Sequence, residues 1–280
     1  MAQFGYQSMG FGSGASSGAA YDLDSTYGIS VVPLAHWDAS DLNGNGNNNA
    51  GFTDGDGIPL WVDRTQTYSL KQATASAQFL HNTGGLNGGT VPSADTQGAR
   101  ASTAIVYDAA GSSTATLSAA ASSWNVYHAG SVTAYQPYFG LYMWIEGTAA
   151  ADFKIMYTPG GNNPVTKVRV DDDGGSNITE FTSTTAFRDT GGSNEHWFEV
   201  RNTDDTNELD CRINVDGVAV QDYSAVDIPT SLTVTRHGYN HVFNGQLAIG
   251  EVLFFDTSLG DPDRAIIESY LNAKYGITDS

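Results

Sequence analysis

Cysteine, long apolar runs and basic residues are all scarce in this chain. Its single cysteine, Cys211, excludes an intrachain disulfide. This residue lies on the apolar side of an alternating stretch, residues 209–215, which predicts a small buried side chain rather than a reactive thiol. No run of about 18 apolar residues is present, so the sequence predicts no membrane-spanning segment.

The shortage of basic residues determines the charge of the chain. Lys and Arg number 12 against 31 Asp and Glu, which gives a net charge of -19. Such a surface repels phosphate groups and anionic lipids, so neither nucleic acid nor a membrane is an expected partner. Residues 1–25 also lack the basic start and the apolar core of a secretory signal. We therefore expect synthesis in a host cytoplasm without a signal peptide.

Small and polar residues take the place of helix-forming stretches. The chain has 32 glycines and is rich in Ser, Thr, Asn and Ala, which favours short strands joined by turns. Its 280 residues suit one large all-β domain or two small ones.

The clearest local signals lie near the C-terminus. Asp261 is the predicted N-cap of a helix, Pro262 suits its first position, and Gly276 suits a left-handed end. An apolar stripe follows from the spacing of Ile266, Ile267, Tyr270, Leu271 and Tyr275. The remaining polar positions are predicted to face solvent: Arg264, Glu268, Asn272 and Lys274. We expect this helix to dock on the apolar residues 246–256, a predicted strand buried on both faces.

Strand signals recur along the rest of the chain. Residues 209–215 and 218–220 form a predicted hairpin around the turn Asp216-Gly217. The core is expected to begin with Val31, Val32, Leu34 and Trp37. Further strands are predicted at residues 60–64, 102–107, 124–128, 138–146, 153–157 and around 168–170.

Residues 41–57 are the densest run of Asn, Asp and Gly in the chain. Oxygen ligands that alternate with glycine suit calcium, and Asp54 and Asp56 are the candidate ligands. The spacing does not match a calcium helix-loop-helix site, and the same composition is ordinary turn chemistry. Both interpretations stay open at this point.

Residues 1–28 form a predicted N-terminal arm, and residues 29–280 the globular domain. The arm is rich in Gly and Ser, with Phe4, Tyr6 and Phe11 as candidate anchoring residues. Its few apolar groups cannot offset the entropy of fixing its backbone. It therefore either drapes over its own domain or is held by a sister subunit or a larger assembly.

Catalytic patterns are missing from the sequence. Glu195 and Glu199 have the even spacing of two carboxylates on one side of a strand, but Phe198 and Val200 are expected to face the core and the glutamates water. His237 and His241 lie in a predicted loop rather than in a zinc motif. No nucleophile elbow, phosphate loop or dinucleotide fingerprint is present. We therefore expect a protein that is not an enzyme.

Sugar binding is the chemistry that the composition favours more. Exposed aromatic rings stack on sugars, and Asp and Asn bind their hydroxyl groups. The candidate ligand-binding aromatics, each in polar surroundings, are Trp124, Tyr127 and Tyr239. The alternative is that these rings belong to the core or to an interface.

Three passages resemble the LamG-like, concanavalin A-like lectin and glucanase domains. They are residues 34–42 (LAHWDASDL) with 60–64 (LWVDR), residues 213–220 (INVDGVAV) and residues 244–277. The resemblance implies an all-β fold, an antiparallel two-sheet jelly-roll sandwich with a short C-terminal α-helix. The chain departs from the family in an Asp-Gly turn where Asn-Gly is common, and it lacks the Glu-x-Asp-x-x-Glu pattern of the glucanases.

Because such domains occur in phage and bacterial proteins, we expect a structural virion protein of a tailed phage: a capsid decoration, a head fibre or a tail-associated protein. The arm would bind other virion proteins, the protein would form a homo-oligomer, and a host-surface glycan is a further expected partner. The alternative function is a carbohydrate-binding module or adhesin at a cell surface, with calcium as its cofactor. The fold supports either function, because one sandwich hosts lectins, hydrolases and structural modules.

Overall fold

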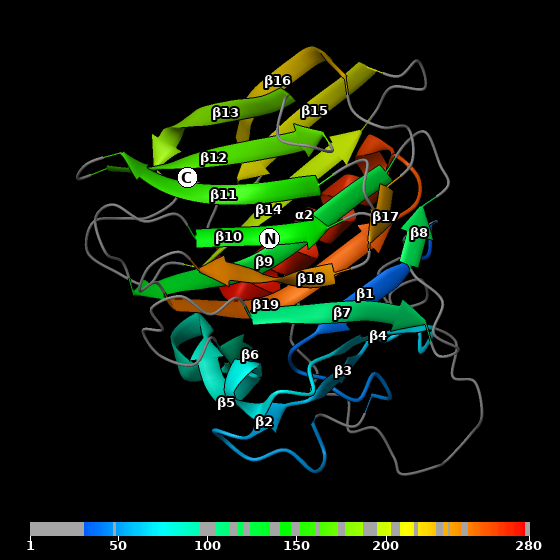
Figure 1. The fold of residues 1–280 in the computed structure, drawn as a ribbon, viewed down its shortest axis with the longest axis vertical. Coiled ribbons are helices and arrows are strands. Elements are labelled where there is room, and N and C mark those ends of the chain that lie inside the picture. The colour runs from blue at the N-terminus through cyan, green and yellow to red at the C-terminus, as the bar shows by residue number, and fades with distance from the viewer. Residues whose placement is uncertain are drawn as a thin grey trace, which may run out of the picture.

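The structure is a computed structural model of the chain (Figure 1). It describes residues 31–46, 49–95, 105–111, 117–119, 124–134, 141–146, 152–160, 163–172, 177–186, 195–202, 208–215, 218–227, 232–234, 236–241 and 246–277. Phe4, Tyr6 and Phe11 lie outside these residues, so the arm over residues 1–28 stays a prediction.

Two large antiparallel sheets form the body of the domain. The nine-stranded sheet has the order β16 (Val218–Asp227), β15 (Glu208–Val215), β14 (Glu195–Asn202), β9 (Trp124–Ala134), β19 (Gln246–Phe255), β6 (Val91–Asp95), β5 (Phe79–Leu86) and β2 (Gly57–Ile58), and β1 (Ala35–Asp38) also pairs with β19. The eight-stranded sheet has the order β13 (Asn177–Ala186), β12 (Asn163–Asp172), β11 (Asp152–Gly160), β10 (Leu141–Glu146), β18 (Arg236–His241), β7 (Ile105–Gly111), β4 (Tyr68–Lys71) and β3 (Leu60–Val62). A small third sheet joins β17 (Leu232–Val234) to β8 (Leu117–Ala119).

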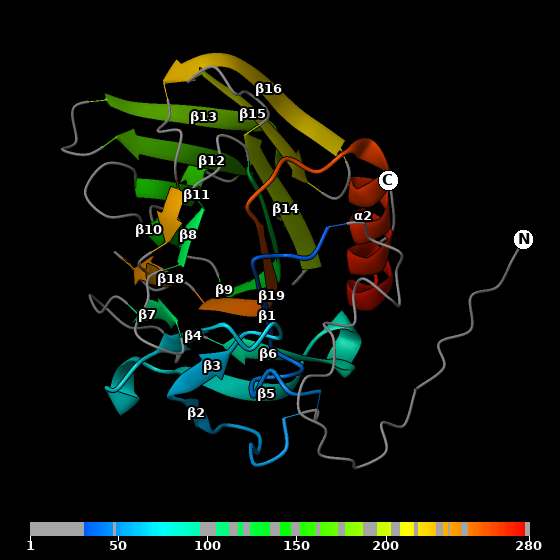
Figure 2. The same ribbon diagram turned by 90° about the vertical axis from the view of Figure 1, so that its right-hand side faces the viewer.

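Helices are few in the described part of the chain. They are the short 3-10 helices η1 (Ala75–Ala77) and η2 (Asn87–Gly89) and the α-helix α2 (Asp261–Tyr275). Figure 2 shows α2 on the outer face of the nine-stranded sheet, with the eight-stranded sheet on the opposite side. The predicted all-β sandwich with a C-terminal helix is therefore confirmed. None of the described helices has the length and apolar character needed to cross a membrane.

The helix and the strand before it pack as the sequence predicts. One buried cluster joins Leu253 and Phe255 of β19 to Ile267 and Leu271 of α2. A register shift in the pairing of β19 with β9 falls at Gly250. A side chain at this glycine would lie 2.5 Å from the ring of Tyr275, so the small residue allows the helix to approach the strand closely.

The ends of α2 differ slightly from the prediction. Gly260, not Asp261, is the N-cap, and it offers no side chain to cap the first turn. The helix ends at Gly276 in the left-handed conformation, with φ of 68°, as predicted. The predicted hairpin is also confirmed, because Val215 of β15 pairs with Val218 of β16. Val32 was expected in the core, but it is 47% exposed.

Candidate functional site

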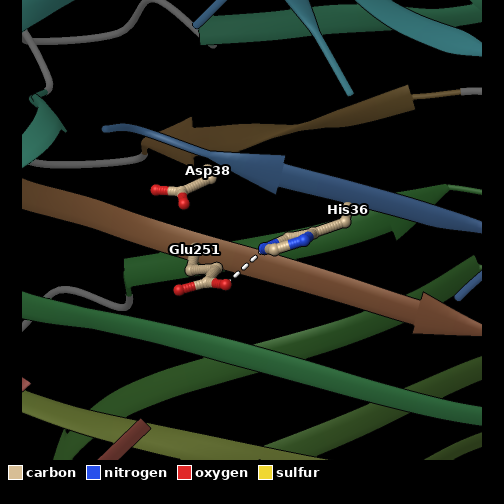
Figure 3. A group of neighbouring side chains, drawn as sticks. All are labelled: His36, Asp38 and Glu251. Carbon is tan, nitrogen blue, oxygen red and sulfur yellow. Dashed lines mark hydrogen bonds and ion pairs between the residues drawn. The ribbon is translucent and has the colours of Figure 1, made fainter. Parts of the chain in front are cut away.

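A buried cluster of charged and polar groups lies between α2 and the nine-stranded sheet. His36 and Asp38 come from β1, Glu251 from the neighbouring β19, and Lys274 from the last turn of α2. His36 and Asp38 are two residues apart, so both side chains leave the strand on one face, toward Glu251 (Figure 3). None of these four side chains is more than 8% exposed.

Lys274 supplies the positive charge at the centre of this cluster. Its Nζ lies 2.9 Å from Asp38 Oδ2, 2.8 Å from Glu251 Oε2 and 3.0 Å from the hydroxyl of Tyr270. The rings of Tyr270 and Tyr275 are each centred 5.5 Å from the same ammonium group. Burial alone would lower the pKa of Lys274, but Asp38 and Glu251 outweigh it and raise this pKa well above its ordinary value.

Glu251 is the acceptor shared by the whole cluster. His36 Nε2 makes a short contact with Oε1, the Tyr270 hydroxyl donates at 2.8 Å, and the Tyr275 hydroxyl donates to Oε2 at 3.1 Å. Burial would raise the pKa of Glu251, yet the charge of Lys274 lowers it. Burial would also raise the pKa of Asp38, but Lys274, His36 and Arg64 hold it far below its ordinary range. Both carboxylates are therefore ionised and paired at neutral pH.

A second ion pair fastens the first turn of α2. Arg264 donates two hydrogen bonds of 2.6 Å to the two carboxylate oxygens of Glu199 in β14. The same carboxylate accepts from Asn125 at 2.7 Å and from the Tyr127 hydroxyl at 3.0 Å, both residues of β9. The pKa of Arg264 is raised because these bonds to Glu199 outweigh its burial. The two cationic side chains thus attach both ends of α2 to the sheet.

These positions correct three sequence predictions. Glu199 was expected to face water but has no exposed surface, because it shares a strand face with the buried Trp197 beneath α2. Arg264 and Lys274 were expected to be solvated, yet each is only 8% exposed. The sequence does contain a signal for the burial of both cations. Residues 264, 267, 271 and 274 recur at three- and four-residue steps, so Arg264 and Lys274 lie on the apolar stripe. A lone Glu251 in an apolar strand likewise requires a buried partner.

The predicted sugar-stacking aromatics come from strands of two different sheets. Tyr127 has no exposed surface and donates to Glu199, so it cannot stack on a sugar. Trp124 begins β9 in the nine-stranded sheet, whereas Tyr239 lies on β18 in the eight-stranded sheet. Trp124 and Tyr239 therefore stay predictions.

Asp54 and Asp56 lie exposed in the loop before β2. Asp54 Oδ1 accepts from the backbone amide of Thr83 at 2.9 Å, and Asp56 Oδ2 accepts from that of Thr53 at 2.7 Å. Asp56 thus takes part in turn chemistry, the second interpretation of this loop, whereas Asp54 ties the loop to β5. Calcium at the two residues stays a prediction. Among the described residues, three metal-capable side chains converge instead at His36, Asp38 and Glu251, with donor atoms within 4.8 Å.

A metal ion at that buried convergence would compete with Lys274. The ammonium group already lies between Asp38 and Glu251, within hydrogen-bonding distance of both. A divalent cation beside it would meet strong repulsion at close range in a site with low solvent access. The cluster therefore already contains its cation, and its role is to hold β1, β19 and α2 together.

No protein-family model and no curated protein sequence matches the chain. Several solved structures are similar in part. The botulinum neurotoxin serotype G binding domain is 8% identical with a TM-score of 0.49, and the match covers 88% of this chain and 51% of that one. A Trypanosoma rangeli sialidase in complex with sialic acid is 12% identical with a TM-score of 0.48, over 88% of this chain and 33% of that one.

A third similar structure belongs to a study of botulinum neurotoxin type C, whose cell entry depends on interaction with two ganglioside molecules. It is 12% identical with a TM-score of 0.39, over 53% of this chain and 36% of that one. This chain thus spans between about a third and a half of the length of these three solved chains. At such identities and TM-scores, the likenesses carry no functional argument.

Proposed function

We propose that the protein is a non-catalytic β-sandwich module that acts by binding carbohydrate through its exposed loops. The observation that carries the proposal is the burial of Glu199 and Glu251 in ion pairs with α2. Both carboxylates are engaged inside the protein, where they do not face a substrate.

Glycoside hydrolysis requires two carboxylates that flank a substrate bond, at roughly 5–5.5 Å for retention or 6.5–9.5 Å for inversion. Glu199 and Glu251 have no exposed surface, and Asp38 is 3% exposed. Each is bound to a lysine or arginine inside the protein and is therefore not available to a substrate. The geometry favours a structural role for all three carboxylates.

The exposed loops offer the hydrogen-bonding groups that a sugar needs. Within residues 41–57, Asn45, Thr53, Asp54 and Asp56 place an amide, a hydroxyl group and two carboxylates on the surface of the domain. The net charge of -19 opposes sialylated or phosphorylated ligands. We therefore propose neutral saccharides as the ligand class.

A glycan array tests this function. The full chain is applied to neutral and sialylated oligosaccharides in calcium and, separately, in chelator, and a parallel assay measures the release of reducing sugar. We expect binding to neutral glycans and no sugar release. An array without any signal in either buffer contradicts the carbohydrate function, and sugar release contradicts the non-catalytic one.

We further propose that this module belongs to a virus particle, as the LamG-like resemblance and the composition of residues 1–28 suggest. One contact supports an anchoring arm: the chain enters the domain next to β1, which Asp38 joins to Lys274 of α2 through a buried ion pair. A pull on the arm would therefore load a strand that this ion pair ties to α2.

Removal of residues 1–28 tests the arm. We expect a domain that melts like the full chain but no longer forms its oligomer. Circular dichroism and light scattering measure these two properties. An unchanged oligomeric mass would contradict the anchoring role.

A further inference from the structure

The loop that precedes β2 is a rigid platform on the surface of the nine-stranded sheet. The amide of Gly55 donates to the carbonyl of His81 at 2.7 Å, and the amide of His81 donates to the carbonyl of Asp56 at 2.8 Å. Asp54 Oδ1 adds a bond of 2.9 Å to the amide of Thr83. Because β5 holds the loop at three points, its side chains are pre-organised.

An aromatic ring on this platform is partly open to solvent. Phe52 is half-buried, and its ring meets the imidazole of His81 edge-on, with 6.0 Å between the ring centroids. The side chain of Phe52 is therefore held against the strand while part of its surface stays accessible. A fixed, partly exposed ring is the element that stacks on the apolar face of a sugar.

Two carboxylates of the same loop act electrostatically on His81, and each leaves one oxygen available. Asp54 uses Oδ1 for Thr83, and Asp56 uses Oδ2 for Thr53. Their other oxygens have no hydrogen-bond partner within the described part of the chain. The bonds from Thr53 lower the pKa of Asp56, so it is an ionised acceptor at neutral pH. Beside them, Gly55 leaves open space where a Cβ would stand.

His81 gives an independent sign of a ligand. It is only 2% exposed, yet its Nδ1 has no hydrogen-bond partner among the described residues. A buried nitrogen without a partner is rare in folded proteins. Burial lowers the pKa of His81, although Asp54 and Asp56 oppose this shift. The imidazole packed edge-on against Phe52 therefore keeps an unused hydrogen-bonding nitrogen next to the loop.

We propose that Phe52, Asp54 and Asp56 form a binding subsite for a neutral saccharide. The ring of Phe52 stacks on the sugar, and the two available carboxylate oxygens accept from its hydroxyl groups. This inference rests on the proposed carbohydrate function and assigns it a place. In this proposal the carboxylate oxygens contact the sugar hydroxyl groups directly, without a bound metal ion.

Titration calorimetry tests the subsite with the neutral oligosaccharide that gives the strongest array signal. Phe52→Ala removes the stacking ring, whereas Asp54→Asn and Asp56→Asn keep the loop-facing acceptor and change the available oxygen. We expect each variant to raise Kd about tenfold or more. The matched controls are Val32→Ala, an exposed apolar residue on another segment, and Asp256→Asn, an exposed carboxylate. Both controls should bind within about twofold of wild type.

The outcomes separate the site from the function. If wild type binds glycans and all three site variants bind equally well, the subsite is refuted while the carbohydrate function stands. If wild type binds no glycan, both fail. Binding that chelator abolishes refutes the direct contacts. The two Asn variants change exposed side chains, so they keep the test decisive should Phe52→Ala fold poorly.

Discussion

Replacement of Lys274 by methionine removes the ammonium group that lies between Asp38 and Glu251. Its contacts of 2.9 Å and 2.8 Å with their carboxylates correspond to about 6 kcal/mol each at an effective dielectric constant of about 20. Most of this offsets the desolvation of the charges. The variant leaves two buried carboxylates without their shared cation, and such a change costs roughly 3–5 kcal/mol. We expect the free energy of unfolding to fall by that amount.

Urea unfolding followed by circular dichroism measures this loss. Lys71→Met is the control, because Lys71 is an exposed lysine of β4, and it should change stability by less than about 0.5 kcal/mol. The double variant with Glu251→Gln should lose less than the sum of the single variants, since it also removes a stranded charge. If Lys274→Met lowers the free energy of unfolding by less than about 1 kcal/mol, the conclusion that Lys274 holds α2 on the sheet is refuted.

Three further predictions concern stability. Gly250→Ala should destabilise the domain by about 1–3 kcal/mol, because its Cβ would lie 2.5 Å from the Tyr275 ring; an unchanged urea midpoint would argue against this close packing. The lowered pKa values of Asp38 and Glu251 mean that the native state binds fewer protons than the unfolded state below about pH 5. Their contribution to stability is complete at pH 7 and shrinks as the pH falls toward their folded pKa values. The free energy of unfolding of Asp38→Asn, measured from pH 7 to 3, should therefore fall less steeply than that of wild type. Metal-free sugar contacts at Asp54 and Asp56 predict equal melting curves in calcium and in chelator, and a reversible rise in melting temperature with calcium would favour the calcium interpretation of residues 41–57 instead.

Local signals in the sequence determined the helix and its strand. The end of α2 at Gly276 follows from the chemistry of a glycine cap. The strand before the helix follows from the spacing of its apolar residues within a short stretch. The hairpin at residues 208–227 follows in the same way from alternation around an Asp-Gly turn. Such features are decided by neighbours in sequence, so a single chain is enough to predict them.

The partners of the charged residues were decided by the tertiary structure. Lys274 meets Asp38 across 236 positions of the chain, and Arg264 meets Glu199 across 65. Helical spacing places both cations on the packed stripe, but it does not say which strands lie beneath them. The sequence therefore predicted a docked helix with a solvated polar face. Only the pairing of β1 with β19, and of β9 with β14, brings the carboxylates under the helix.

The candidate sugar subsite divides in the same way. The Asn, Asp and Gly content of residues 41–57 marked this loop as a candidate site, because its oxygen donors and glycines suit either a cation or a tight turn. The approach of Phe52 to His81, and of Asp54 to Thr83, depends on the antiparallel pairing that places β5 beside the loop. Composition alone thus indicated where ligand chemistry was available. Only the packing of distant strands decided which oxygens and which ring face solvent together.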